Sequence, residues 1–174
     1  MGNVRFFSDP HFGHLNMALK RGFKSAEEQD EYIVQQWNSV VNKRDITYIL
    51  GDITYEKKSG YEILSRLNGL KHVVLGNHDR RQDVEELLKY VKSVSGVIKY
   101  KRKYFLSHCP IHPAELGRVK VNIHGHVHED SIVTYKWDYE NKVDTEVPHP
   151  KYKNVSAEAI DYTPKLLTEL FEDE

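Results

Sequence analysis

Side chains that bind metal ions recur along the sequence, each shortly after an apolar run. They are carboxylates, imidazoles and a carboxamide, which supply oxygen and nitrogen ligands to divalent metals. In chain order they are Asp9, His11, Asp52, Asn77, His108, His126 and His128. These are more donors than a single ion normally takes, so the sequence predicts two metal ions. Two neighbouring cations need a shared ligand, and the Asp52 carboxylate is the predicted bridge.

The residues around these donors form short motifs. Gly51 precedes Asp52, Gly76 begins Gly-Asn-His-Asp, and Gly125 begins Gly-His-Val-His. An isolated Asp-x-His or Gly-Asp is more often a turn or a helix start than a metal site. Here all the motifs follow predicted strands, and open α/β sheets bind ligands at the carboxyl ends of their strands. We therefore expect one shared site.

Runs of β-branched and aromatic residues predict the strands that position these side chains. The runs are Val4 to Phe7, Ile46 to Leu50, His72 to Leu75, Val94 to Tyr100, Tyr104 to Leu106 and Val119 to Ile123. Helices are expected between them, and the clearest follows a capping box of Ser25 with Glu28 and has the apolar positions Ile33, Trp37, Val40 and Val41. Two shorter helices are expected at Tyr61 to Leu67 and at about Asp83 to Tyr90. Strands alternating with helices predict an α/β fold.

The second half of the chain is expected to be richer in antiparallel sheet. Val97 to Tyr100 and Tyr104 to Leu106 predict a hairpin across a Lys-rich turn. The charged segment from Asp138 to Lys153 predicts a surface loop or the tip of a hairpin. A last strand from Asn154 to Tyr162 and a short helix after Pro164 complete the predicted order.

Length and composition predict a single domain over residues 1–174, of which 39% are hydrophobic. Cys109 is the only cysteine, and no apolar run has the length of a membrane span or a signal peptide. We therefore expect a cytoplasmic protein with no membrane partner. The formal charge of -1 lacks the basic excess typical of nucleic-acid-binding proteins. The basic run from Lys99 to Lys103 is interpreted as a solvated turn without a functional role.

The ordered motifs resemble those of the calcineurin-like metallophosphoesterases. The matching blocks are Asp9-Pro10-His11, Gly51-Asp52, Gly76-Asn77-His78-Asp79, His108 and Gly125-His126-Val127-His128. Ser8 to His14, Trp37 to Val41 and Asn154 to Pro164 also resemble a small bacterial and phage subgroup. The resemblance implies an α/β fold, a two-sheet sandwich of mixed β-sheets flanked by helices. It further implies one metal held by Asp9, His11, Asp52 and His128, and a second held by Asp52, Asn77, His108 and His126.

The chemistry implied by this resemblance is hydrolysis of a phosphate ester. A water or hydroxide between two cations has its pKa lowered enough to attack phosphorus near neutral pH. The cations also offset charge on the phosphoryl oxygens. His78 adjoins Asn77 but is not a ligand in the family, so we assign it to the leaving-group oxygen as a proton or hydrogen-bond donor. Mn is the expected metal, and Fe, Zn and Ni accept the same ligands.

The second block departs from that of the family's protein serine/threonine phosphatases, in which an arginine binds the phosphomonoester. Here Ile53, Thr54, Tyr55 and Glu56 follow Asp52. We therefore favour a phosphodiesterase, with a nucleotide or a nucleic-acid end as a candidate substrate, over a broad phosphomonoesterase. A non-catalytic metal-binding scaffold of the same fold is a further alternative, because fold does not fix function. The sequence leaves open the roles of His14, His112, His124, Arg80 and Arg81.

Overall fold

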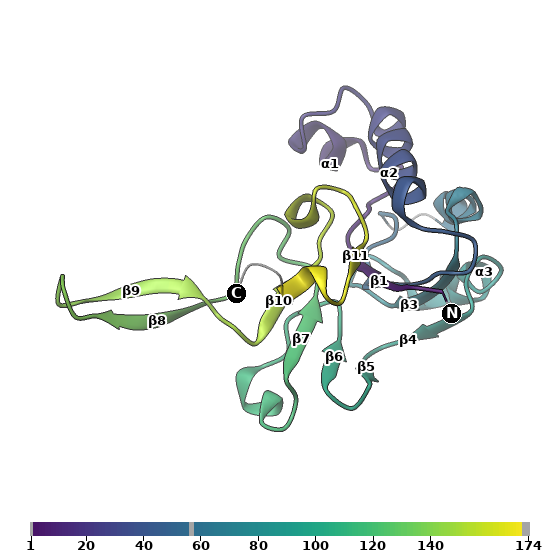
Figure 1. Ribbon diagram of the computed structural model, residues 1–174. Coiled ribbons are helices and arrows are strands. Elements are labelled where there is room, and N and C mark those ends of the chain that lie inside the picture. Colours follow the sequence, from purple (N-terminus) through teal and green to yellow (C-terminus); the bar gives the residue numbers. More distant parts are fainter. Residues whose placement is uncertain (1, 56–57, 172–174) are drawn as a thin grey trace.

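The computed structural model describes residues 2–55 and 58–171 and contains two central β-sheets (Figure 1). The first sheet has the strand order β11-β1-β2-β3-β4. Its parallel strands are β1 (Val4–Phe7), β2 (Ile46–Ile49), β3 (Leu70–Val74) and β4 (Ser93–Ser95). At the edge, β11 (Lys165–Leu166) pairs antiparallel with β1.

The second sheet has the strand order β10-β7-β6-β5. Its strands are β5 (Ile98–Tyr100), β6 (Tyr104–Leu106), β7 (Val121–His124) and β10 (Tyr152–Asn154). β7 is parallel to both of its neighbours, whereas β5 and β6 form the predicted antiparallel hairpin. Mixed sheets with flanking helices agree with the predicted fold class.

Helices α1 (Leu15–Lys20) and α2 (Ala26–Val40) pack together on one side of the molecule (Figure 1). The predicted cap of α2 is present, because Ser25 Oγ accepts a hydrogen bond from Glu28 N at 3.2 Å. Shorter helical segments are η1 (Lys58–Arg66), η2 (Arg81–Asp83), α3 (Val84–Leu87), η3 (Pro113–Leu116), η4 (Glu158–Ile160) and η5 (Glu169–Phe171). None of the helices in the described ranges combines the length and apolar character needed to cross a bilayer.

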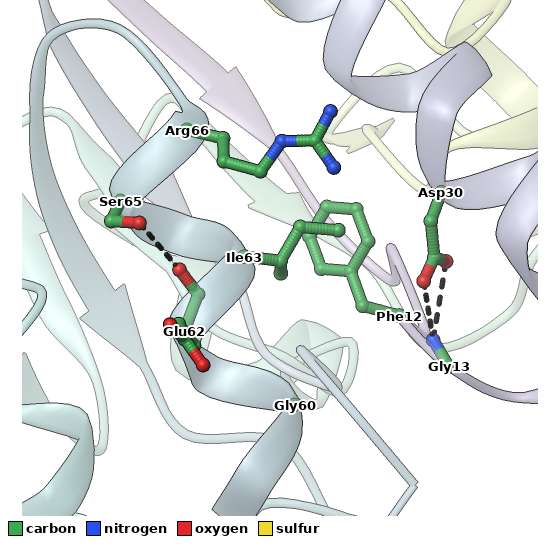
Figure 2. A pocket seen from close by; sticks show the side chains of 8 residues that line it. All are labelled: Phe12, Gly13, Asp30, Gly60, Glu62, Ile63, Ser65 and Arg66. Carbon is green, nitrogen blue, oxygen red and sulfur yellow. Dashed lines mark hydrogen bonds between the residues drawn. The ribbon is translucent and has the colours of Figure 1, made fainter.

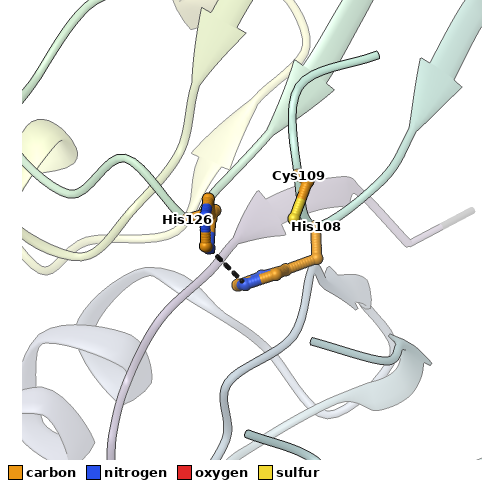
Figure 3. Close-up of side chains that lie close together, drawn as sticks. All are labelled: His108, Cys109 and His126. Atoms are coloured by element: carbon orange, nitrogen blue, oxygen red, sulfur yellow. Dashed lines mark hydrogen bonds between the residues drawn. The ribbon is translucent and has the colours of Figure 1, made fainter. Parts of the chain in front are cut away.

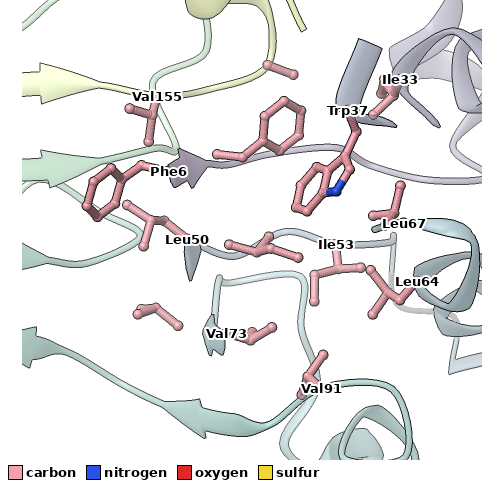
Figure 4. Close-up of a cluster of buried hydrophobic side chains, with 14 of the residues drawn as sticks. Phe6, Ile33, Trp37, Leu50, Ile53, Leu64, Leu67, Val73, Val91 and Val155 are labelled. Carbon is pink, nitrogen blue, oxygen red and sulfur yellow. The ribbon is translucent and has the colours of Figure 1, made fainter. Parts of the chain in front are cut away.

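Strand β1 lies between two layers because its successive side chains point to opposite faces of the sheet. On one face, the Phe7 ring contacts the Trp37 ring of α2 edge-on, with 5.5 Å between centroids. On the other face, Phe6 contacts Tyr100 of β5 in the same manner at 5.7 Å. The core therefore extends on both sides of the first sheet and also includes Ile33, Leu50, Ile53, Leu64, Val73 and Val155 (Figure 4).

A third, two-stranded sheet projects from the body of the molecule (Figure 1). It consists of β8 (Val133–Asp138) and β9 (Val143–Pro148), which are antiparallel. The tip of this hairpin falls within the segment from Asp138 to Lys153, for which the sequence predicted a loop or a hairpin tip.

The predicted run from Val94 to Tyr100 is divided between the two sheets. β4 ends at Ser95 in the first sheet, and β5 begins at Ile98 in the second. Gly96 and Val97 lie between the two strands. The two predicted short helices also differ from expectation: the first is the 3-10 helix η1, and the second is reduced to η2 followed by the short α3.

The predicted strand over residues 154–162 is wrong. The strand β10 ends at Asn154, and residues 158–160 form the helical turn η4. Ala157 and Ile160 are both buried, and this three-residue spacing suits a helical turn rather than a strand. Asp161 then takes a left-handed φ of 52°, which ends the turn.

The short helix predicted after Pro164 begins later than expected, because β11 occupies Lys165–Leu166. Its backbone pairs Lys165 with Phe6 and Leu166 with Arg5. The buried Arg5 side chain donates a hydrogen bond from Nη1 to Pro164 O at 2.9 Å. These contacts fix the segment as a sheet edge, and the helical turn η5 follows only at Glu169.

Candidate metal centre

All of the predicted ligand side chains lie just beyond the carboxyl ends of strands from both sheets. They are Asp9 and His11 after β1, Asp52 after β2, Asn77 after β3, His108 after β6, and His126 and His128 after β7. The loops after β1 and β2 stay paired beyond the strands, because His11 N donates to Asp52 O at 3.1 Å and Phe12 N donates to Ile53 O at 2.8 Å. Backbone pairing thus holds the first two groups of side chains side by side.

Asp52 lies at the centre of the cluster. Its Oδ2 is 3.8 Å from His11 Nε2, 3.4 Å from His108 Nε2 and 4.0 Å from His78 Nε2. Asp9 Oδ1 is 3.9 Å from His11 Nε2, and the His128 ring stacks on the His11 ring with 5.3 Å between centroids. A single carboxylate oxygen, Asp52 Oδ2, therefore lies between histidines that belong to the two predicted metal sites.

His108 connects the remaining donors. Its Nε2 is 2.8 Å from Asn77 Oδ1. The same nitrogen is 3.1 Å from His126 Nδ1, as Figure 3 shows. The structure thus brings every predicted ligand into one continuous cluster. Within it, three groups have ligand atoms that lie within 4.8 Å of one another: Asp9 with His11 and His128, Asp9 with Asp52 and His108, and His108 with Cys109 and His126.

Cys109 in the last group is a candidate that the sequence did not indicate. Its side chain lies beside His108 and His126 (Figure 3). Burial raises the pKa of the Cys109 thiol, and the negative charges of Asp52 and Asp9 raise this pKa further. Because the thiolate is the form that binds metal, these effects make Cys109 a poorer ligand than its histidine neighbours.

The backbone at this cluster is strained. Asp9, His11, Asp52, His126 and His128 have φ between 50° and 73°, in the left-handed region that non-glycine residues rarely adopt. Such residues persist where the surrounding structure fixes them, and they cluster at functional sites. The backbone conformation thus marks five of the seven residues that the chemical argument selected.

Glycines allow the carboxylates of Asp52 and Asp9 to lie close to neighbouring backbone segments. A Cβ on Gly76 would collide with Asp52 Oδ1, and a Cβ on Gly125 would collide with Asp9 Oδ2. The second oxygen of Asp9 is held in place, because Oδ2 accepts hydrogen bonds from His126 N at 2.9 Å and Ser156 Oγ at 3.1 Å. The other oxygen, Oδ1, points into the cluster.

Buried atoms at the centre of the cluster lack hydrogen-bond partners within the described ranges. They are Asp9 Oδ1 and both ring nitrogens of His11. Buried polar atoms are almost always satisfied, since an unsatisfied one is costly. A carboxylate oxygen and an imidazole nitrogen 3.9 Å apart are suitable ligands for one divalent cation. The residues present therefore fit a metal ion.

The charges of the cluster also favour a cation. Burial lowers the pKa of His11 to about 3, which leaves the neutral imidazole that metals bind. Burial opposes a charge on Asp52, but its hydrogen bond to His108 and the charge of His108 bring the Asp52 pKa below its ordinary value. The His108 pKa is raised despite burial, through Asp52 and then Asp9. The two carboxylates thus attract positive charge to this position.

A model of the calcineurin-like phosphoesterase family matches residues 2–168, which is nearly the whole chain. The chain belongs to this family. Its members are in general metal-dependent hydrolases of phosphate esters, and the cluster contains the ligand types that this chemistry needs.

Known relatives support this membership. The uncharacterized protein MJ1445 of Methanocaldococcus jannaschii is 32% identical over 169 residues, which cover 94% of this chain and 86% of the relative. The gene 66 protein of Mycobacterium phage D29 is 37% identical over 84 residues, or 46% of this chain and 42% of the phage protein. Among solved structures, a protein of unknown function from Aquifex aeolicus, AQ665, aligns over 100% of both chains with a TM-score of 0.71 and 25% identity.

A largely buried ion pair of Glu158 and Arg21 holds two of the proposed ligands in place. Glu158 Oε1 lies 3.0 Å from His128 Nδ1 and accepts a hydrogen bond from Arg21 Nε at 2.7 Å. The same guanidinium donates to Asp9 O at 2.7 Å and to Pro10 O at 3.1 Å. Burial opposes a charge on Glu158, but the His128 and Arg21 hydrogen bonds lower its pKa to about 2. Sequence reasoning assigned Glu158 and Arg21 no role.

Asp79 is a second supporting residue that the sequence did not reveal. Its carboxylate accepts backbone hydrogen bonds from Asp52 at 2.8 Å, Ile53 at 3.1 Å and Gly76 at 2.9 Å. The last residue of the Gly-Asn-His-Asp block therefore fixes the loops after β2 and β3 relative to each other. The block itself was the available signal, although we used only its Asn and His.

The side chains that the sequence left open have varied surroundings. His124 Nδ1 is 2.8 Å from Gly125 O, and His112 Nδ1 accepts a hydrogen bond from Ala114 N at the start of η3. Arg80 pairs with Asp83, with Nη2 2.7 Å from Oδ2, so its guanidinium is already engaged. The η2 helix begins at Arg81, and His14 stacks on Tyr55 beside the cluster.

Proposed function

We propose that the protein is a phosphodiesterase with two divalent metal ions. The observation that carries this proposal is the position of Asp52 Oδ2, which lies within 4.0 Å of nitrogens of His11, His78 and His108. A carboxylate between imidazoles from two sides suits a ligand shared by two cations. The proposed sets are Asp9, His11, Asp52 and His128 for one ion, and Asp52, Asn77, His108 and His126 for the other.

When bound, two such cations lower the pKa of a water molecule between them and offset charge on the phosphoryl oxygens. The chain itself supplies the orientation of the site. The backbone N–H of His78 donates to Asp52 Oδ1 at 2.9 Å, which fixes both the carboxylate and the His78 loop. The His78 side chain is 30% exposed, so its imidazole can reach substrate. We assign this imidazole the donation of a proton to the departing oxygen.

Glu158 is expected to orient His128 toward its metal ion, so Glu158→Gln should weaken metal binding. Carboxylates that accept a hydrogen bond from a metal-binding histidine orient the ring and raise its basicity, and their loss typically costs about 10- to 100-fold in metal affinity or activity. We expect a weakening of this size for one of two Mn ions, measured by equilibrium dialysis.

The matched control for this variant is Glu31→Gln. Glu31 also pairs with an arginine, Arg66, at 2.6 Å, but this pair is exposed and lies outside the ligand cluster. Glu31→Gln should therefore leave both Mn affinities unchanged. Wild-type affinity at both sites in Glu158→Gln, with unchanged thermal stability, would show that Glu158 does not orient the ligand.

Diesters are expected to be better substrates than monoesters. A monoester dianion carries an extra charge that an arginine fork normally neutralises. None of the four residues that follow Asp52 is an arginine, and Arg80 is engaged by Asp83. With Mn present, kcat/KM for bis(p-nitrophenyl) phosphate should therefore exceed that for p-nitrophenyl phosphate.

A monoester preference of about tenfold or more, equivalent to about 1.4 kcal/mol of transition-state stabilisation, would contradict the assignment. Arg80→Ala and Arg81→Ala would then identify the clamp. If metal is bound but no ester is hydrolysed, the proposal of enzymatic activity fails as a whole.

A further inference from the structure

A groove opens beside the candidate metal centre. It has a volume of about 310 Å³ and is lined by Gly13, His14, Leu15, Asn16 and Tyr55. Ligand pockets begin at about this size. Tyr55 is 43% exposed and Leu15 is 50% exposed, so both present apolar surface to solvent. Among the residues that the structure describes, no lining side chain carries a carboxylate, an ammonium or a guanidinium group.

The groove adjoins the side of the centre where His78 lies. The Tyr55 ring is 4.8 Å from the His78 ring, and the His14 ring is 5.7 Å from the His11 ring, measured between centroids. An ester group that departs beside His78 would therefore leave into this groove or along it. The groove is therefore in a position to hold one ester group of the substrate.

Paired loops hold the aromatic wall of the groove. Phe12 and Thr54 form an isolated parallel bridge, which continues the pairing of β1 and β2. His14 and Tyr55 follow this bridge, and their rings stack with 4.3 Å between centroids and 14° between planes. Gly13 N donates to both carboxylate oxygens of Asp30, at 3.0 and 3.1 Å, which fixes the loop that carries His14.

A neighbouring cavity is less suitable for a substrate group, although it is larger, about 380 Å³ (Figure 2). It shares Gly13 with the groove, but two of its charged side chains, Asp30 and Arg66, are already paired. Asp30 accepts the hydrogen bonds from Gly13, and Arg66 forms a fork with Glu31 at 2.6 and 2.7 Å. A ligand that binds Asp30 or Arg66 would have to displace these partners.

We infer that the Tyr55–His14 groove binds a planar aromatic ring, such as a nucleobase, on the ester arm beside His78. The inference rests on the proposed phosphodiesterase function and names a substrate class for it. Stacking against aromatic side chains recognises nucleobases without regard to sequence, because every base has a π-face. Uncharged aromatic and apolar walls suit such a ring better than a sugar or an aliphatic alcohol.

The test compares two probes that differ only in the base. Adenosine 5'-monophosphate and ribose 5-phosphate are titrated into the Mn-loaded protein by calorimetry. The wild type should bind the nucleotide more tightly than the sugar phosphate. Tyr55→Ala should weaken nucleotide binding by about 5- to 150-fold, the range that base–aromatic stacking supplies, and leave ribose 5-phosphate unchanged. Tyr55→Phe keeps the ring and should bind the nucleotide like the wild type.

Tyr139→Ala is the matched control, because Tyr139 is 85% exposed between β8 and β9, outside the groove. It should change neither affinity. Equal affinity of the wild type for the two probes, undetectable nucleotide binding, or an equal loss for both probes in Tyr55→Ala would overturn the inference. The binding measurement also distinguishes the two proposals. Base-dependent binding without turnover would reject phosphodiesterase activity and support nucleobase binding in the groove. Turnover without a base preference would support the activity and reject nucleobase binding.

Discussion

Asp52→Asn is expected to impair both metal sites and to lower kcat by about 10³-fold or more. The Asp52 carboxylate occupies the centre of the cluster, between His11 and His108, and we propose that it is shared by both ions. The amide keeps an oxygen on one arm but removes the charge that offsets the repulsion of two cations. Loss of several kcal/mol of charge stabilisation corresponds to a rate change of this order. Metal content by mass spectrometry and hydrolysis of a chromogenic diester measure the two effects.

His128→Ala is the comparison that isolates sharing. His128 belongs to only one of the proposed ligand sets, so this variant should weaken one metal site and retain the other. Its fold should also persist, because the His128 side chain is 21% exposed and pairs with Glu158 at the edge of the cluster. If Asp52→Asn kept two tightly bound ions and wild-type turnover, the assignment of Asp52 as the shared ligand would be rejected.

The positions of the ligand loops were predictable because local sequence determines them. Each apolar run is short enough to be one strand, and the polar residue that follows must lie at the strand's carboxyl end. β1, β2, β3, β6 and β7 all occur within a few residues of their predicted runs. Once parallel strands are assumed, convergence of Asp52 and Asn77 follows from topology alone.

The supporting residues were not predictable because their partners are distant in the sequence. Arg21 and Glu158 are 137 residues apart, and Ser156 reaches Asp9 across 147 residues. Nothing in the local pattern of Arg21, near the end of α1, distinguishes it from a surface arginine. Only the folded chain shows that its guanidinium contacts Glu158 and the backbone of the first motif.

The end of the chain was mispredicted for a different reason. The sequence from Asn154 to Tyr162 has apolar residues at Val155, Ala157 and Ile160, which agree with a strand at first and with a helical turn later. Tertiary contacts decide the outcome, since Ser156 bonds to Asp9 and Glu158 to Arg21. The requirements of the site thus override the weak strand preference of this segment.

The left-handed backbone of several proposed ligands also lies beyond sequence reasoning. Asp and His tolerate positive φ more often than most residues, but the sequence does not reveal which of them adopt it. In this chain the strained positions include Asp52 and His126, each directly after a glycine that follows a strand, and Asp9, two residues after the end of β1. We interpret the strain as the cost of turning several side chains toward one point.

His78→Ala is expected to leave both metal ions bound and to slow hydrolysis by about 10²- to 10⁴-fold, the usual contribution of a positioned general acid. Its imidazole is 4.0 Å from Asp52 Oδ2 and partly exposed, whereas the proposed ligands His11 and His108 are buried. His112→Ala is the control, because His112 is an exposed residue that caps η3. It should alter neither metal content nor rate.

The leaving group distinguishes proton donation by His78 from a general loss of structure. An aryl ester with an acidic phenol needs little protonation as it departs, so His78→Ala should slow its hydrolysis least. An alkyl ester departs as a basic alkoxide and should show the full loss. The slope of log kcat/KM against leaving-group pKa should therefore become steeper in His78→Ala than in the wild type. Parallel slopes with a slower rate would reject proton donation by His78. A wild-type rate would mean that His78 acts only through its backbone N–H to Asp52 Oδ1, a contact that alanine retains.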